Sequence, residues 1–227
     1  MPARLKELHA LPRFPKMSVY PTYLDAADAY ARKLRAAKIL PGNDADALLR
    51  LHERIAEIYP RNQADMVSCH NDLKPENVLF DGDRVWLVDW EAAFLNDRFV
   101  DLSVVANFLV TTEEEEKAFL ETYFGEAPGE YRLAQFYLTR QILHMFYASI
   151  FSLIGAAGKP VDEDEKMPAF REFHDRMWAG EFCLKTPEAK LRYARVHLGQ
   201  VLANQHTERF EKSRQILVAG GRAEDPV

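Results

Sequence analysis

The chain has 227 residues, of which 48% are hydrophobic and 28% are charged, an ordinary balance for a globular protein that can bury a sizeable core. Its formal net charge of -6 excludes the strongly basic footprint of nucleic-acid-binding domains, so we expect no nucleic-acid partner. The two cysteines, Cys69 and Cys183, are far apart in sequence and provide neither a disulfide framework nor a zinc-binding spacing, which fits a reducing cytoplasm.

Two stretches bear on membrane targeting. The first sixteen residues, MPARLKELHALPRFPK, are charged and contain no continuous apolar run, so we expect no signal peptide there. The apolar segment 142–157, ILHMFYASIFSLIGAA, is shorter than the roughly 20 residues that a bilayer-spanning helix needs. We therefore predict a buried helix at this position, no membrane span, and a cytoplasmic protein.

Helical periodicity dominates the first sixty residues. Apolar side chains recur at three- and four-residue spacing over 23–37 and again over 45–59. Pro41 and Gly42 separate the two stretches, and both residue types interrupt regular structure. The sequence therefore predicts two consecutive amphipathic helices.

The clearest strand signal follows over residues 78–88. Three apolar residues, 78–80, precede the turn-forming sequence Asp81-Gly82-Asp83, and a second run with apolar character covers 84–88. An Asp-Gly pair between two such runs is typical of a tight β-hairpin. We predict a hairpin here, and find no other convincing strand signal in the chain.

Helical patterns occupy the remaining sequence. Thr112 followed by Glu115 is a capping-box pattern, and Thr186 followed by Pro187 supplies an N-cap and a first-turn proline. The helices predicted on this basis cover 99–110, 113–123, 131–157 and 187–217. The fold class is therefore mainly α with one short β-hairpin, an α+β arrangement.

Polar residues gather at both ends of the predicted hairpin, within HNDLKPENVLFDGDRVWLVDWE (residues 70–91). Because a tight hairpin folds back on itself, we expect Asp72 and Asn77 to lie near Asp89 and Glu91. Converging carboxylate and amide oxygens suit Mg²⁺, which proteins commonly hold by one or two carboxylates together with substrate phosphates. A separate carboxylate can orient a hydroxyl group and accept its proton.

This arrangement resembles a known family. HNDLKPEN (residues 70–77), followed by Asp89-Trp90-Glu91, is similar to the catalytic core of the protein-kinase-like superfamily. More narrowly, it resembles the aminoglycoside phosphotransferase and choline/ethanolamine kinase family. Asp89 is followed by Trp-Glu rather than Phe-Gly, no Ala-Pro-Glu closes an activation segment downstream, and an Asp101-Leu102 helix start follows, as in the small-molecule branch.

The resemblance implies roles for the residues of the motif. Asp72 corresponds to the catalytic base, and Asn77 and Asp89 correspond to the two Mg²⁺ ligands, with ATP as the phosphoryl donor. Lys74 matches the position of a basic residue that offsets the charge of the γ-phosphate. The implied partner is a small-molecule hydroxyl substrate, and a cationic one by analogy with choline and aminoglycosides.

Three further residues receive supporting roles from the same resemblance. His70 is expected to pack and hydrogen-bond within the catalytic loop rather than to react. Asp101 is expected to tether that loop through its backbone amides. Glu91 is ambiguous between supporting the metal ligands and contacting the substrate.

The resemblance covers the helical lobe of the family and not its smaller β lobe. That β lobe carries a glycine-rich loop and a strand lysine over the nucleotide. Here the first glycine is Gly42, nothing before His70 resembles either feature, and LKELHALP (residues 5–12) is similar to the helix that begins the large lobe. We therefore expect residues 1–218 to form the C-terminal lobe of a kinase-like fold with the N-terminal β lobe missing, followed by a flexible tail, 219–227.

Three functional hypotheses remain open. The first is an ATP- and Mg²⁺-dependent phosphotransferase that acts on the hydroxyl of a small molecule. We expect such an enzyme to be inactive where the β lobe is absent. The second is a non-catalytic kinase-like remnant that binds a ligand or partner through the same cleft. The third, a fragment of a protein Ser/Thr kinase, is disfavoured by the absence of an activation segment. The sequence carries no signal for the acceptor or the oligomeric state.

Overall fold

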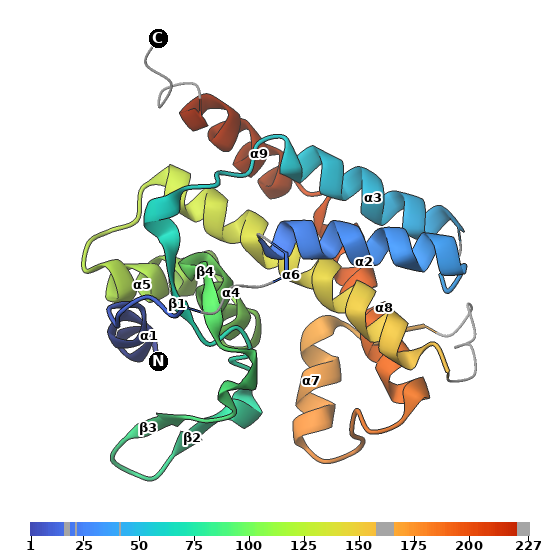
Figure 1. The fold of residues 1–227 in the computed structure, drawn as a ribbon, viewed down its shortest axis with the longest axis horizontal. Helices are drawn as coiled ribbons and strands as arrows, with labels where there is room; N and C mark the ends of the chain where they lie inside the picture. The colour runs from blue at the N-terminus through green and yellow to red at the C-terminus, as the bar shows by residue number, and fades with distance from the viewer. Residues whose placement is uncertain (16–18, 21, 41, 158–165, 222–227) are drawn as a thin grey trace. The chain divides into compact units, whose positions relative to one another are not determined.

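The computed structural model describes residues 1–15, 19–20, 22–40, 42–157 and 166–221, and it confirms a mainly helical fold with a few short antiparallel strands (Figure 1). Its helices are α1 (Pro2–His9), α2 (Tyr23–Ala37), α3 (Gly42–Ala56), α4 (Arg98–Leu109), α5 (Glu113–Phe124), α6 (Glu130–Gly155), α7 (Phe170–Trp178), α8 (Pro187–Asn204) and α9 (Glu208–Gly221). The chain divides into two compact units: unit 1 comprises Met1–Thr22, Ile58–Arg140 and Lys212–Val227, and unit 2 comprises Tyr23–Glu57 and Gln141–Glu211.

Most predicted helices are present, with one correction. The helix predicted over 187–217 is two helices, because α8 ends at Asn204 and α9 begins at Glu208. The hydroxyl of Thr207 accepts a hydrogen bond from the backbone N–H of Phe210 at 3.2 Å, so Thr207 acts as the N-cap of a new helix. The capping box of Thr112 and Glu115 at the start of α5 is confirmed.

Unit 1 contains the strands. The predicted hairpin is confirmed as β2 (Val78–Phe80) paired with β3 (Val85–Leu87). Its turn is stabilised by the carboxylate of Asp81, which accepts hydrogen bonds from the backbone N–H groups of the residues two and three positions later. Gly82 takes a positive φ of 99° in this turn, a conformation that glycine adopts without steric cost.

A second two-stranded sheet in unit 1 was not predicted. Strand β1 (Met66–Cys69) pairs antiparallel with β4 (Phe94–Asp97), with Met66 opposite Asp97 and Cys69 opposite Phe94. This pair frames the motif region, since the catalytic-loop sequence leaves the end of β1 and the segment after the hairpin returns as β4 (Figure 1). Helix α1 packs against β1, α4 and α5, which brings the first residues of the chain to the same place.

Helix α4 starts from a buried aspartate. The Asp97 carboxylate caps the helix by accepting a hydrogen bond from the N–H of Phe99 at 2.8 Å, and it also accepts one from the Tyr59 hydroxyl at 3.0 Å. Burial raises the pKa of Asp97 to about 7, an effect larger than the opposing influence of these two hydrogen bonds. The cap matters to the site because it fixes the first turn of α4, where Asp101 lies.

Unit 2 is entirely helical within the described residues. Helix α2 packs against α3, and α7 packs against α8. Buried histidines form part of its core, with Nδ1 of His144 2.9 Å from Nδ1 of His197, and burial lowers the pKa of His197 well below its usual value. His197 is therefore neutral at physiological pH, and we interpret the buried pair as core structure.

Helix α6 contains most of the apolar segment 142–157 that was compared above with a membrane-spanning helix. It runs from Glu130 to Gly155, and side chains such as Leu138 and Leu143 are completely buried, as predicted for this apolar segment. None of the helices in the described parts of the chain is long and apolar enough to cross a bilayer.

The predicted tail falls partly outside the described residues. Helix α9 continues to Gly221, so residues 219–221 are helical, and 222–227 lie outside the described part. The division into a lobe over 1–218 and a tail over 219–227 stays a prediction.

The raised pKa of Asp97 makes the stability of unit 1 depend on pH. Because the folded-state pKa of about 7 exceeds the usual value, the contribution of Asp97 to the unfolding free energy is fully present below about pH 4 and is lost as the pH rises through 7. Asp97→Asn keeps an acceptor for the helix cap and does not ionise. We expect the free energy of unfolding of the variant, relative to wild type, to increase by roughly 4 kcal/mol between pH 4 and pH 8, because each pKa unit between the usual value and about 7 corresponds to about 1.4 kcal/mol.

Urea denaturation of both proteins at the two pH values measures this difference directly. A difference that stays the same at pH 4 and pH 8 would contradict the assignment of a raised pKa to Asp97.

Candidate active site

The predicted catalytic loop leaves β1 and enters the hairpin through a single 3₁₀ turn, Pro75–Asn77. The side chain of His70 is completely buried at the start of this loop. Its Nδ1 atom accepts a hydrogen bond from the N–H of Asp72 at 3.4 Å, so its Nε2 atom carries the proton and donates to the carbonyl of Val88 at 2.9 Å. His70 thus connects the loop to the end of β3 and takes the supporting position expected of it.

The backbone of Asn77 makes the second connection between the loop and the hairpin. Its carbonyl accepts a hydrogen bond from the N–H of Val88 at 3.0 Å. Since Val88 directly precedes Asp89, these bonds place the backbone of Asp89 beside Asn77, as the folding back of the hairpin predicted. The structure therefore brings the two expected metal-binding positions together.

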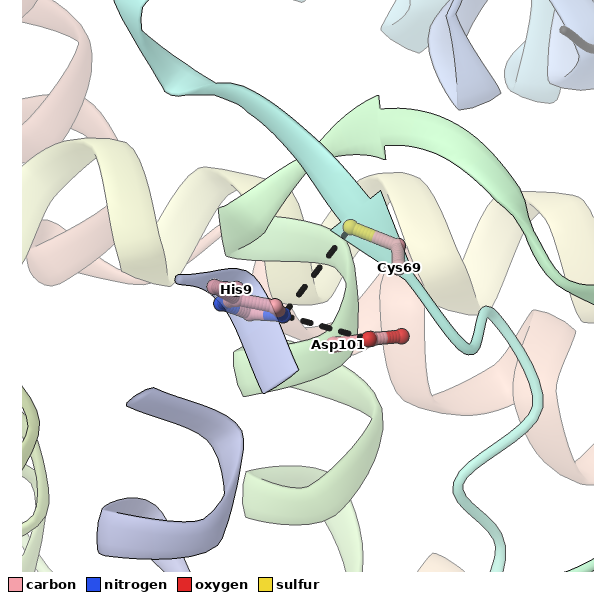
Figure 2. A group of neighbouring side chains, drawn as sticks. All are labelled: His9, Cys69 and Asp101. Carbon is pink, nitrogen blue, oxygen red and sulfur yellow. Dashed lines mark hydrogen bonds and ion pairs between the residues drawn. The ribbon is translucent and has the colours of Figure 1, made fainter. Parts of the chain in front are cut away.

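The Asp101 carboxylate lies under the loop and is completely buried. Its Oδ2 atom accepts the N–H of His70 and its Oδ1 atom accepts the N–H of Asn71, both at 2.7 Å. Figure 2 shows that His9 and Cys69 lie next to this carboxylate, with Nε2 of His9 3.2 Å from Oδ2. Asp101 occupies the tethering position that the sequence implied.

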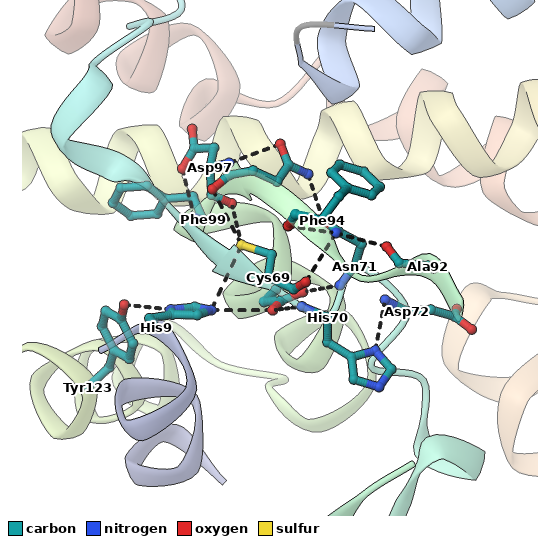
Figure 3. A network of polar contacts seen from close by, with 12 residues as sticks. His9, Cys69, His70, Asn71, Asp72, Ala92, Phe94, Asp97, Phe99 and Tyr123 are labelled. Carbon is teal, nitrogen blue, oxygen red and sulfur yellow. Dashed lines mark hydrogen bonds and ion pairs between the residues drawn. The ribbon is translucent and has the colours of Figure 1, made fainter. Parts of the chain in front are cut away.

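Asn71 has a role that sequence reasoning missed. Its backbone is left-handed, with a φ of 67°, which asparagine tolerates better than most residues. Its side-chain amide donates to the carbonyl of Ala92 at 3.0 Å and its oxygen accepts from the amide of Asn96 at 2.7 Å (Figure 3). Asn71 therefore ties the catalytic loop both to β4 and to the turn that follows Asp89. The only sequence feature that could have indicated this role is the asparagine itself, because asparagine tolerates the left-handed backbone of a sharp turn.

Asp72 is the half-buried carboxylate at the centre of the loop. Its Oδ2 atom accepts hydrogen bonds from Nζ of Lys74 at 2.6 Å and from Nδ2 of Asn77 at 2.9 Å. The same Asn77 amide also donates to the backbone carbonyl of Asp72 at 2.8 Å. Lys74 thus pairs with the candidate base, and the side-chain amide of Asn77 holds that base in place.

These bonds define how Asn77 is oriented. Because Nδ2 is used twice by Asp72, the side-chain oxygen Oδ1 is the atom left for another ligand, and it takes no hydrogen bond from the described residues. Asn77 is buried, so this oxygen is held in a fixed direction. An oriented amide oxygen is a suitable ligand for a hard cation.

Asp89 is exposed and has an unusual backbone. It takes a left-handed conformation, φ 65° and ψ 64°, immediately before the 3₁₀ turn Trp90–Ala92. Its carboxylate has no hydrogen-bond or ion-pair partner among the described residues. Non-glycine residues in this conformation are uncommon and concentrate at functional sites. Glu91 is exposed in the turn after it, which leaves its expected role open.

The hairpin beside the site exposes large apolar side chains. Phe80 is 68% exposed and Trp86 is 52% exposed, and Leu79 and Trp90 are also exposed. A depression of about 470 Å³, lined by residues of α1 and β3, adjoins this surface. So much exposed apolar area on one short hairpin is typical of a surface that a ligand or another part of a protein covers.

Comparisons with known proteins identify the family of the chain. The model of the phosphotransferase enzyme family, APH, matches residues 3–136, more than half of the chain. Protein LicA of Haemophilus influenzae is 33% identical over 84 residues, which are 36% of this chain and 31% of that protein. The match favours the small-molecule branch over a fragment of a protein kinase.

Two solved structures share the fold. A choline/ethanolamine kinase family protein from Mesorhizobium loti has a TM-score of 0.71 at 18% identity, covering 95% of this chain and 66% of that one. The choline kinase LicA from Streptococcus pneumoniae has a TM-score of 0.54 at 18% identity, covering 88% and 62%. The chain thus spans about two thirds of these kinase-like structures.

The expected resemblance and the expected kinase-like fold are both confirmed. The family match over residues 3–136 includes every residue of the candidate site. On this basis the chain belongs to the phosphotransferase enzyme family.

Proposed function

We propose that this chain carries the base and the metal ligands of an ATP- and Mg²⁺-dependent phosphotransferase that acts on the hydroxyl group of a small molecule. The observation that carries the proposal is the double use of Asn77. Its side chain holds the Asp72 carboxylate, and its backbone holds the strand that leads into Asp89. One residue thereby couples the candidate base to the candidate metal site.

The residues present fit a magnesium ion. Oδ1 of Asn77 is directed away from Asp72, and the exposed carboxylate of Asp89 follows on the adjoining strand. Oxygen ligands from one carboxylate and one amide, completed by phosphate oxygens and water, are the usual environment of Mg²⁺ in phosphoryl-transfer sites. When bound there, the ion would neutralise charge on the phosphates of ATP.

Asp72 supplies the acid–base step in this proposal. Its carboxylate orients the substrate hydroxyl and accepts the proton as the hydroxyl oxygen forms its bond to the γ-phosphorus, while the bond from that phosphorus to ADP breaks. The hydrogen bond from Asn77 keeps the carboxylate in one position for this task. Lys74, now 2.6 Å from Asp72, lies where its charge can offset that of the transferred phosphoryl group.

The acceptor we propose is a small cationic alcohol, similar to choline, ethanolamine or an aminoglycoside. Support comes from the family match and from relatives described as choline or ethanolamine kinases. The described geometry of unit 1 does not choose among these acceptors, so a panel of candidates belongs in the first activity experiment.

Turnover should depend on the surface of the hairpin being covered. Positioning and electrostatic stabilisation supply nearly all the catalysis in phosphoryl transfer, and both require a nucleotide held from two sides. The exposed side chains of Phe80 and Trp86 lie beside the site on the hairpin that leads to Asp89. We propose that the nucleotide and the remaining third of a kinase-like fold cover this surface in an active enzyme.

The metal site predicts a Mg²⁺-dependent interaction with ATP. At an ATP concentration of about ten times the dissociation constant, binding should stabilise the wild-type chain by about 1.4 kcal/mol with Mg²⁺, and by much less with EDTA. Asp89→Asn should abolish the Mg²⁺-dependent part, because it removes the charged ligand. Thermal unfolding followed by differential scanning fluorimetry measures the effect.

Asp83→Asn is the matched control. It removes the same charge from the turn of the same hairpin, where the side chain is 86% exposed, and should leave the ATP response unchanged. An equal response of wild type and Asp89→Asn to Mg²⁺ and ATP would contradict the metal assignment.

The assignment of Asp72 as the base predicts that a variant without this carboxylate loses phosphorylation rate but still binds ATP. Asp72→Asn should reduce phosphorylation of the best acceptor about 10² to 10⁴-fold, because the amide cannot accept the hydroxyl proton. Release of ADP, measured across choline, ethanolamine and aminoglycoside acceptors, provides the readout.

Glu76→Gln, an exposed acid of the same loop, controls for the change in charge and should keep wild-type activity. Mg²⁺-dependent ATP binding without turnover of any acceptor, in a protein whose hairpin surface is covered, would instead support the alternative of a non-catalytic binding module.

A further inference from the structure

His9 lies at the end of α1 and connects three elements of unit 1. Its Nδ1 atom is 2.7 Å from the hydroxyl of Tyr123 on α5, and its Nε2 atom is 3.2 Å from Oδ2 of Asp101 on α4. The imidazole is buried, and its ring meets that of Tyr123 edge to face (Figure 3). None of the roles assigned so far to the catalytic motif accounts for this histidine.

The partners of the imidazole define which nitrogen carries its proton. An ionised carboxylate only accepts hydrogen bonds, so Nε2 of His9 donates to Asp101. In the neutral form of the imidazole, Nδ1 is then an acceptor and receives the hydroxyl proton of Tyr123. A directed chain results, from Tyr123 to His9 to Asp101, and it ends on the same Oδ2 atom that accepts the N–H of His70.

A metal site is the competing interpretation of this cluster. One ligand atom each from His9, Cys69 and Asp101 lie within 4.8 Å of one another. Burial, however, raises the pKa of the Cys69 thiol well above its usual value, so the sulfur keeps its proton and donates it to the carbonyl of Asn96 at 3.4 Å. A metal ion would need the thiolate and would break the His9–Asp101 hydrogen bond, so we read the cluster as hydrogen-bonded.

We infer that His9 is a positioning residue for the catalytic loop. By donating to Oδ2, it holds the Asp101 carboxylate in the orientation in which its two oxygens accept the amides of His70 and Asn71. Those two amides immediately precede Asp72. The orientation of Asp101 therefore sets the position of the backbone that leads into the candidate base. The catalytic meaning of this inference rests on the proposed function, whereas the structural link does not.

The link can be measured at the two amides themselves. In His9→Leu, which fills similar space without a donor, we expect hydrogen exchange of the His70 and Asn71 amides to become about tenfold faster or more, because a hydrogen bond to a charged group is lost. In His9→Gln the side-chain amide can still donate to Asp101, and most of the protection should return. Residue-resolved NMR exchange at constant pH provides both values.

Buried amides of α6 in the same unit, such as that of Leu138, act as the internal reference. Acceleration confined to the loop in His9→Leu, with recovery in His9→Gln, supports the inference. Unchanged exchange at His70 and Asn71 would overturn it. So would equal acceleration in α6, since that outcome means only that the whole unit is less stable.

Two further measurements separate this inference from its alternatives. If the enzyme turns over a substrate, His9→Leu should lower kcat about tenfold with KM unchanged, whereas an unchanged kcat would contradict a positioning role. If no acceptor is phosphorylated, the exchange experiment alone decides the link. If Zn²⁺ stabilises wild type but not His9→Leu, the cluster of His9, Cys69 and Asp101 is a metal site and the hydrogen-bonding role inferred for His9 is wrong.

Discussion

The candidate site depends on one buried carboxylate, that of Asp101. It accepts the backbone amides of His70 and Asn71 at 2.7 Å each, at the point where the chain turns sharply out of β1. Without this acceptor, two buried N–H groups would lack a partner, at a cost of about 1–3 kcal/mol each. Asp101 is in turn placed by the start of α4, which Asp97 caps. The position of Asp72 therefore follows from the first turn of a helix later in the chain.

The hairpin adds the second half of the site. Val88 is held by two hydrogen bonds: its carbonyl accepts one from Nε2 of His70, and its N–H donates one to the carbonyl of Asn77. The turn after Asp89 is held by the Asn71 side chain through Ala92. Asp89 thus lies between two anchored segments, which explains how a left-handed backbone persists there without glycine. The candidate base and a candidate metal ligand are thereby brought together by short hydrogen bonds.

What could be predicted from the sequence was local. The hairpin, most helices and the motif residues all depend on turn chemistry, periodicity or spacing over a few residues. The pairing of β1 with β4 could not be predicted, because it joins four-residue strands far apart in sequence and depends on tertiary contact. The break near Thr207 was missed because the polar run 204–209 contains neither proline nor glycine to mark it. His9 gave no signal, since a single histidine at a helix end is usually a core residue whose partners only the fold reveals.

The central claim is that Asn77 and Asp89 form one cation site beside Asp72. Its most direct test is paramagnetic broadening of NMR signals by Mn²⁺, an oxygen-preferring substitute for Mg²⁺, added at low stoichiometry with ATP. The account predicts that the Asn77 side-chain amide and the backbone amides next to Asp89 broaden first, and that Asp89→Asn prevents this. Broadening that begins elsewhere, for example at the acidic start of α5, and leaves these signals sharp would contradict the account.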